Sequence, residues 1–359
     1  MRLVMIHDVA PGARLGKTLY GEDGRILLHR GTELSEAYID TLGHMGYQAL
    51  YVLDAHALEV PLKEPISDRT RQEALVAVRD TFRKVREPNR TLDQEWTSRR
   101  ILYNAATSII AELQGNRDLN LQIAELRTAS SYTFDHSVNV CLLGLALAER
   151  LGMTQAKLVD LAVGLLLHDI GKTLLSPEVM LLHEGAEPIL DERYRQHARL
   201  GYDMLQQFGK TMSGPSRIIA LQHHERVDGS GFPKGLTESE IHPFAQIAAI
   251  ANTYDTLIHD LGSGHPSPPH QAMEYLMAAG GSHFNHAMVS EFLKLLVPFP
   301  LETSVRLSTL EEGLVVAVDR GLPMRPTVRV TTDPDGRVRP KAYELDLRKH
   351  PDITIVQAF

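Results

Sequence analysis

The centre of the chain contains the segment Leu161-Ala-Val-Gly-Leu-Leu-Leu-His-Asp-Ile-Gly-Lys172. Its seven-residue apolar run is much shorter than the roughly 20 residues that span a bilayer, so it predicts a buried core helix. His168-Asp169 stands where this helix ends, and a buried charge is costly unless it is paired or coordinates a metal. The pairs His7-Asp8 and His259-Asp260 lack such an apolar run, so only the central pair predicts a site.

Further histidines occupy comparable positions on both sides of this segment. His197 lies on a stripe of apolar residues at helical spacing, where a single histidine would be an ordinary core residue. A short apolar helix leads into His223 and His224, and His136 begins another apolar helix. Five histidines and one aspartate therefore lie at the ends or on the inner faces of predicted core helices.

This donor set consists of imidazole and carboxylate without thiolate, because the chain has a single cysteine, Cys141. Such donors suit iron, manganese, cobalt, nickel or zinc, and the set is too large for one metal with an open position. The number of donors therefore predicts a site for two metal ions. In a two-metal site Asp169 can bridge the ions, a bridging water becomes hydroxide for attack on phosphorus, and Lys172 neutralises a phosphate oxygen.

Composition limits the classes of protein to which the chain can belong. Of 359 residues, 43% are apolar and 23% charged, which predicts a folded protein of more than one domain. The 37 basic and 45 acidic side chains give a net charge of −8, which argues against a nucleic-acid polymer as partner but leaves a small phosphorylated ligand open. One cysteine excludes a disulfide framework, and no secretory or membrane-inserting segment is visible, so we expect a cytoplasmic protein.

Hydrophobic periodicity divides the chain into four parts and predicts a mainly α fold. Residues 1–60 form a small mixed α/β regulatory or interaction unit, and residues 61–125 form a helical connector. Residues 126–297 form the helical bundle that carries the histidines. Residues 298–359 form a small all-β unit, for which packing or oligomerisation is the simplest role.

Four motifs of the bundle resemble, in order, the signatures of the HD-GYP subclass of HD-domain phosphohydrolases. They are His168-Asp-Ile-Gly-Lys172, His197-Ala-Arg-Leu-Gly201, His223-His-Glu-Arg-Val-Asp-Gly-Ser-Gly-Phe-Pro233 and Ala251-Asn-Thr-Tyr-Asp-Thr-Leu257. The resemblance covers residues 126–297. It implies an HD-type helical bundle that binds two or three metal ions, with iron expected first and manganese as the alternative. It also implies a phosphodiesterase that hydrolyses cyclic di-GMP to pGpG or GMP.

The resemblance also implies roles for individual residues. Lys172 and Asp255 are assigned to substrate binding, and Asp169 and Lys172 to catalysis. The loop Gly231, Phe232 and Pro233 is assigned to contact with substrate or with a signalling partner such as a diguanylate cyclase. The implied metal ligands are His136, His168, Asp169, His197, His223, His224 and Asn252.

The chain departs from the family pattern at four places. Asn252 stands where the family has aspartate, which leaves the site one charge more positive. Tyr132 replaces the glutamate of three-metal members, which favours two metals. The residues from Asp260 to His270 replace an Arg-Pro-Tyr-Arg stretch that would clamp phosphate. Phe232 replaces the tyrosine from which the subclass takes its name.

These departures keep two alternatives open. The first is a catalytically weak or inactive module that senses a cyclic dinucleotide or docks a signalling partner. The second is a phosphodiesterase for another cyclic or linear nucleotide. The sequence also leaves a homodimer open, with residues 1–60 as one surface through which it could form.

Overall fold

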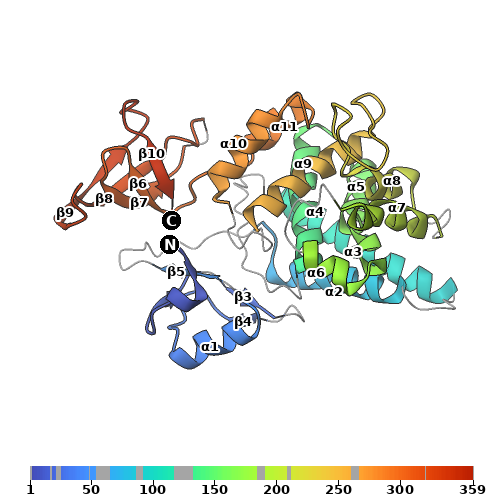
Figure 1. Cartoon of the computed structure of the whole chain (residues 1–359), viewed down its shortest axis with the longest axis horizontal. Coiled ribbons are helices and arrows are strands. Elements are labelled where there is room, and N and C mark those ends of the chain that lie inside the picture. Colours follow the sequence, from blue (N-terminus) through green and yellow to red (C-terminus); the bar gives the residue numbers. More distant parts are fainter. Residues whose placement is uncertain are drawn as a thin grey trace.

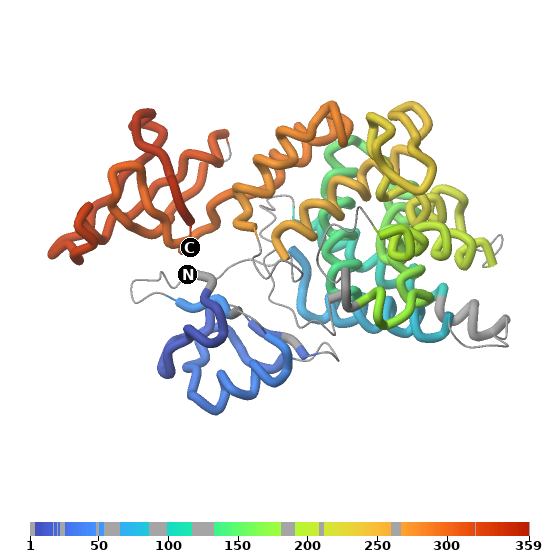
Figure 2. Tube along the Cα trace, viewed as in Figure 1, coloured from blue at the N-terminus to red at the C-terminus, as the bar shows by residue number. Residues whose placement is uncertain are grey.

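The computed structural model describes residues 2–16, 18–21, 26–47, 49–53, 65–85, 92–116, 132–183, 191–207, 212–259, 267–319 and 321–358. It has three parts, a helical bundle and two smaller units that contain the strands (Figure 1). Figure 2 follows the chain from the blue N-terminal unit through the bundle to the red C-terminal sheet. Arg30 of the first unit donates a 2.7 Å hydrogen bond to the Glu302 carboxylate beside the C-terminal sheet, so the two small units touch.

The N-terminal unit has its own small core. Its described residues contain a three-stranded sheet, a two-stranded sheet, a short 3-10 helix and one α-helix. The side chain of Ser35 caps the α-helix by accepting a 3.2 Å hydrogen bond from the Tyr38 amide. The antiparallel sheet has the strand order β1-β5-β2. The elements are β1 (Arg2–Met5), η1 (Ile6–Asp8), β2 (Arg14–Leu15), β3 (Leu19–Tyr20), β4 (Ile26–Leu28), α1 (Glu36–His44) and β5 (Ala49–Leu53).

The helical bundle contains all the predicted metal ligands. Its first two helices, α2 (Asp68–Val85) and α3 (Leu92–Gly115), share one hydrophobic core with the helices that follow, so the predicted connector is packed into the bundle. The remaining elements are α4 (Tyr132–Arg150), α5 (Gln155–Leu166), η2 (Ile170–Leu174), α6 (Pro177–His183), α7 (Glu192–Gln206), α8 (Gly214–Gln222), α9 (Pro243–Ile258), α10 (Pro269–Ala279) and α11 (His286–Leu293).

One backbone contact in the bundle brings two ligand-bearing elements together. Gly171 of η2 lies directly against α7, and a Cβ atom built on it would lie 2.5 Å from the Gly201 amide nitrogen and closer still to the His197 carbonyl oxygen. Only glycine permits so close an approach of two backbones. The contact therefore sets the distance between His168-Asp169 and His197.

The C-terminal unit is a five-stranded antiparallel sheet with the strand order β10-β6-β7-β8-β9 and a separate core. Its strands are β6 (Ser304–Leu307), β7 (Glu312–Ala317), β8 (Thr327–Thr332), β9 (Val338–Asp346) and β10 (Ile355–Ala358). The predicted fold class, a mainly α chain with a mixed N-terminal unit and an all-β C-terminal unit, is confirmed. Among the described residues, no helix combines the length and the apolar character needed to cross a membrane.

Candidate metal centre

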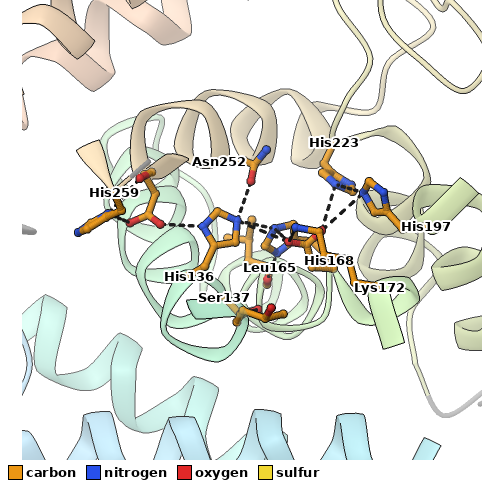
Figure 3. A network of polar contacts seen from close by, with 12 residues as sticks. His136, Ser137, Leu165, His168, Lys172, His197, His223, Asn252 and His259 are labelled. Atoms are coloured by element: carbon orange, nitrogen blue, oxygen red, sulfur yellow. Dashed lines mark hydrogen bonds and ion pairs between the residues drawn. The ribbon is translucent and has the colours of Figure 1, made fainter. Parts of the chain in front are cut away.

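Four imidazoles, those of His136, His168, His197 and His223, lie close together in the interior of the bundle (Figure 3). The carboxylate of Asp169, three residues after the end of the apolar helix α5, lies among them. The Nε2 atoms of His168 and His136 lie 3.3 and 3.6 Å from its Oδ2 atom. The Nε2 atoms of His197 and His223 lie 3.6 and 3.7 Å from its Oδ1 atom. Each oxygen of one buried carboxylate thus faces its own pair of imidazoles.

The ligand atoms form two groups that could each hold a metal ion. One group contains His136, His168 and Asp169, and the other contains His197, His223 and His224. Within each group the nearest ligand atoms lie within 4.8 Å of one another. The predicted histidines therefore come together, although they belong to four separate segments between residues 136 and 224.

Backbone carbonyl groups fix the orientation of three of these imidazoles. The Nδ1 atom of His168 lies 2.7 Å from the Leu165 carbonyl oxygen, and that of His197 lies 2.6 Å from the Tyr194 carbonyl oxygen. The Nδ1 atom of His223 lies 3.1 Å from the carbonyl oxygens of residues 219 and 220. Because a carbonyl can only accept, Nδ1 carries the proton and each Nε2 lone pair is free for a metal.

A carboxylate performs the same task for His136. Its Nδ1 atom donates to Asp255 Oδ2 at 2.7 Å, while its Nε2 atom lies 2.8 Å from Asn252 Oδ1. Asp255 is fully buried and also accepts from Asn139. Its carboxylate, assigned to substrate binding from the sequence, therefore faces the back of a ligand. The carbonyl oxygen of Asn252 lies beside His136 Nε2, in a position from which both atoms could bind the same metal ion.

The charges in the centre suit metal binding. Burial lowers the pKa of His136 and lowers that of His197 to about 4, and it is also the main cause that places the pKa values of His223 and His224 well below 6.5. Burial raises the pKa of Asp169, but Lys172 and the neighbouring imidazoles outweigh it and hold that pKa well below its usual range. At neutral pH these four imidazoles are neutral and the carboxylate of Asp169 is ionised, which are the forms that bind metals.

Lys172 lies beside the carboxylate at the edge of the centre. Its Nζ atom is 2.6 Å from Asp169 Oδ2, and its side chain is 11% exposed. Burial lowers the pKa of Lys172, but Asp169 and Tyr194 outweigh it and raise the pKa above its usual value. The group is therefore a fixed ammonium next to the predicted ligands.

The loop assigned to substrate or partner contact packs against the second group of ligands. The Phe232 ring is 8% exposed and stacks on His224 with centroids 4.5 Å apart and an interplanar angle of 16°. A Cβ atom built on Gly231 would lie 2.5 Å from the His224 carbonyl oxygen, so the loop follows the backbone of the ligand segment closely. Pro233 is exposed. The aromatic body of Phe232 therefore packs against a metal ligand.

Some residues that build the centre were not predicted from the sequence. Glu225 is 1% exposed and holds the loop, because its carboxylate accepts hydrogen bonds from the amides of Lys234 at 2.8 Å and Leu236 at 2.9 Å. His259 lies beside Asp255, with its Nδ1 atom 2.9 Å from the Asp255 carbonyl oxygen. Only its helical spacing of four residues from Asp255 could have indicated this. Residues 260–266 and the side chain of Tyr132 lie outside the described part of the chain.

Comparison with known proteins agrees with this architecture. Residues 119–288 match the model of the HD domain, and residues 304–359 match that of a KOW domain associated with the HD domain. The solved structure of Bd1817, an HDG"Y"P protein from Bdellovibrio bacteriovorus, aligns with a TM-score of 0.50 at 18% identity, over 82% of this chain and 98% of that one. Residues 119–288 therefore have the sequence pattern and the fold of an HD domain, as predicted, and the chain is similar to proteins of the HD-GYP subclass.

Two curated relatives are similar to this chain over the HD domain. The cyclic di-GMP phosphodiesterase PA4108 of Pseudomonas aeruginosa is 30% identical over 213 residues, which are 58% of this chain and 50% of the relative. A cyclic di-GMP phosphodiesterase of Thermotoga maritima is 31% identical over 163 residues, which are 45% of this chain and 44% of the relative. The chain thus spans about half the length of these relatives or somewhat less.

Proposed function

We propose that this chain is a metal-dependent phosphodiesterase that hydrolyses a cyclic dinucleotide. The observation that carries the proposal is the buried Asp169 carboxylate, which has four imidazole Nε2 atoms within 3.3 to 3.7 Å. Relatives named as cyclic di-GMP phosphodiesterases support cyclic di-GMP as the substrate. The products are then pGpG, GMP or both.

The residues present fit two divalent metal ions, with iron expected first and manganese as the alternative. One ion would be held by His136, His168 and Asn252. The other ion would be held by His197, His223 and His224, and Asp169 would serve both. When bound, two such ions supply an activated water as nucleophile and neutralise charge on the phosphate. Four of the imidazoles already present Nε2 for this, because the Nδ1 atoms of His136, His168, His197 and His223 are engaged in hydrogen bonds.

The protein itself supplies orientation and a fixed positive charge. The ammonium of Lys172 is held by Asp169 at 2.6 Å and is partly accessible, so it can contact a phosphate oxygen without leaving its place. A charge that is already in position stabilises the transition state without reorganisation. Lys172 is thus the substrate-phosphate contact of this proposal, and Asp255 is a positioning residue behind His136.

The test combines metal analysis with product analysis after anaerobic purification. The parent chain should contain about two irons or manganeses and release pGpG or GMP from cyclic di-GMP. His168→Ala/Asp169→Ala should lose both metal and product. Lys172→Met should keep metal and lose roughly 100-fold in turnover, while Lys157→Met, an exposed lysine on α5, should behave as the parent. Bound metal without product at high enzyme would contradict the activity on this substrate.

Asn252 favours a second function, that of a non-catalytic module that binds the nucleotide or a signalling partner. A neutral amide at this position binds metal less tightly than a carboxylate. Stoichiometric metal together with saturable binding of cyclic di-GMP and no turnover would establish this function. Turnover of another cyclic or linear nucleotide under the same conditions would establish the enzyme with a different substrate.

A further inference from the structure

Helix α2 carries a buried arginine that reaches towards the metal centre. Arg71 is 4% exposed, and its guanidinium donates a 3.1 Å hydrogen bond to Asn139 Oδ1 on α4. Arg69 lies two residues earlier on the same helix, yet its side chain is 87% exposed and pairs with Glu73. Arginine is rarely buried without a partner that compensates its lost hydration. Arg71 is therefore placed in the interior for a contact that Arg69 does not make.

The hydrogen bonds continue from Asn139 to a predicted metal ligand. Asn139 is fully buried, and its Nδ2 atom donates to Asp255 Oδ1 at 3.1 Å. The other oxygen of Asp255 accepts from His136 Nδ1 at 2.7 Å. Arg71 on α2 is thus connected to His136 through one amide and one carboxylate.

The direction of every bond in this relay is determined by its ends. A guanidinium can only donate and a carboxylate can only accept, so the amide of Asn139 must turn its oxygen to Arg71 and its NH₂ group to Asp255. The same carboxylate then takes the Nδ1 proton of His136. This leaves the Nε2 lone pair of His136 directed at the metal position, beside Asp169.

We propose that Arg71 is a positioning residue for the metal ligand His136, and that α2 is thereby part of the metal centre. Without the guanidinium, the buried Asn139 oxygen loses its donor, which is costly in the interior. The amide then shifts to find another donor for that oxygen, its Nδ2 atom moves away from Asp255, and the carboxylate that holds His136 is less firmly placed. The proposal rests on the metal centre of the proposed function and is independent of the substrate.

The first experiment measures metal binding. The parent, Arg71→Met and the matched surface control Arg69→Met are titrated with Mn²⁺ in the absence of nucleotide, and their unfolding is measured without metal. Arg71→Met should bind one of two Mn²⁺ ions about tenfold more weakly, while the other ion and the control remain unchanged. Unchanged affinities together with lower stability would show that Arg71 only packs, and would overturn the proposal.

A double-mutant cycle tests the route through the amide. Asn139→Leu should weaken the same Mn²⁺ ion, and combining it with Arg71→Met should add no further loss, because both variants break one relay. Fully additive losses would refute the relay. Arg71→Lys, which keeps a buried donor, should fold and recover most of the affinity; if it binds as weakly as Arg71→Met, the donor role is wrong. A parent chain that binds no Mn²⁺ overturns the metal centre itself, whereas bound Mn²⁺ without hydrolysis leaves this inference standing.

Discussion

The backbone contact between η2 and α7 leads to a sharp prediction for Gly171→Ala. The added Cβ atom would lie 2.5 Å from the Gly201 amide nitrogen, 2.9 Å from its Cα atom, and closer still to the carbonyl oxygen of His197. These are main-chain atoms, so no side-chain rotation can relieve the clash. The substitution must move η2 away from α7.

The size of the effect follows from this geometry. Overpacking a well-packed interior usually lowers the free energy of unfolding by about 1–3 kcal/mol. Because the clash involves several backbone atoms, we expect the upper end of this range, about 3 kcal/mol. For a domain of this size that corresponds to a fall in Tm of roughly 6–12 °C. The same shift separates Asp169 from His197, so metal affinity should fall as well.

Two other glycines provide matched controls for the assay, which is thermal unfolding without metal followed by Mn²⁺ titration. A Cβ atom on Gly201 would lie 3.1 Å from the Gly171 nitrogen, a tight contact with main-chain atoms that is less severe than the one at Gly171, and the higher helix propensity of alanine offsets part of it by up to about 1 kcal/mol. A Cβ atom on Gly214 would have no neighbour within 4 Å. Gly214→Ala should therefore change Tm little, and Gly201→Ala should lower Tm less than Gly171→Ala does. If Gly171→Ala unfolds at the parent's temperature, the close contact does not hold the two elements together.

Three further predictions concern other parts of the HD domain. The amide oxygen of Asn252 lies 2.8 Å from His136 Nε2, and Asn252→Asp places a carboxylate oxygen there. The affinity for the more weakly bound Mn²⁺ ion should rise tenfold or more. An unchanged titration curve would contradict a ligand role at this position. Glu225→Ala removes the acceptor of two loop amides and should lower the free energy of unfolding in urea by about 2 kcal/mol, so an unchanged urea midpoint would refute its role. Cys141 is fully buried, and burial raises the pKa of its thiol, so a thiol reagent should label one cysteine per chain in denaturant and almost none in the native protein; rapid native labelling would show the opposite.

The arrangement of the central histidines was predictable because each lies in a strong local pattern. His168-Asp169 ends an apolar helix, and His197 follows the apolar stripe of α7, so helical periodicity alone directs both towards the core. The family motifs then supplied the order of the ligands. Local periodicity and motif spacing are properties of short segments, and such properties can be read without knowing the fold.

The hydrogen bonds behind the ligands were not predictable in this way. His136 and Asp255 are separated by 119 positions, and their contact exists only because α4 packs on α9. The sequence predicts no site at His259, because no apolar run precedes it, yet His259 lies one helical turn after Asp255 at the end of α9, with its Nδ1 atom 3.1 Å from Asp255 Oδ1. The charged pattern of residues 61–125 indicates a connector and conceals Arg71, the one arginine of this segment that is buried among the residues the structure describes.

The layer behind the ligands also bears on how the centre accommodates Asn252. Where the family has a carboxylate ligand, this chain has a neutral oxygen beside His136. His136, however, donates its Nδ1 proton to the buried carboxylate of Asp255 at 2.7 Å, and a carboxylate in that place makes the imidazole a stronger donor to a metal. The carboxylate of Asp255, acting through the imidazole of His136, thus partly replaces the negative charge that Asn252 lacks. Asn139 and Arg71 hold that carboxylate in place, so metal binding by the parent depends on α2. Asn252→Asp supplies a negatively charged ligand directly. The metal affinity of Asn252→Asp should therefore be less sensitive to Arg71→Met than that of the parent.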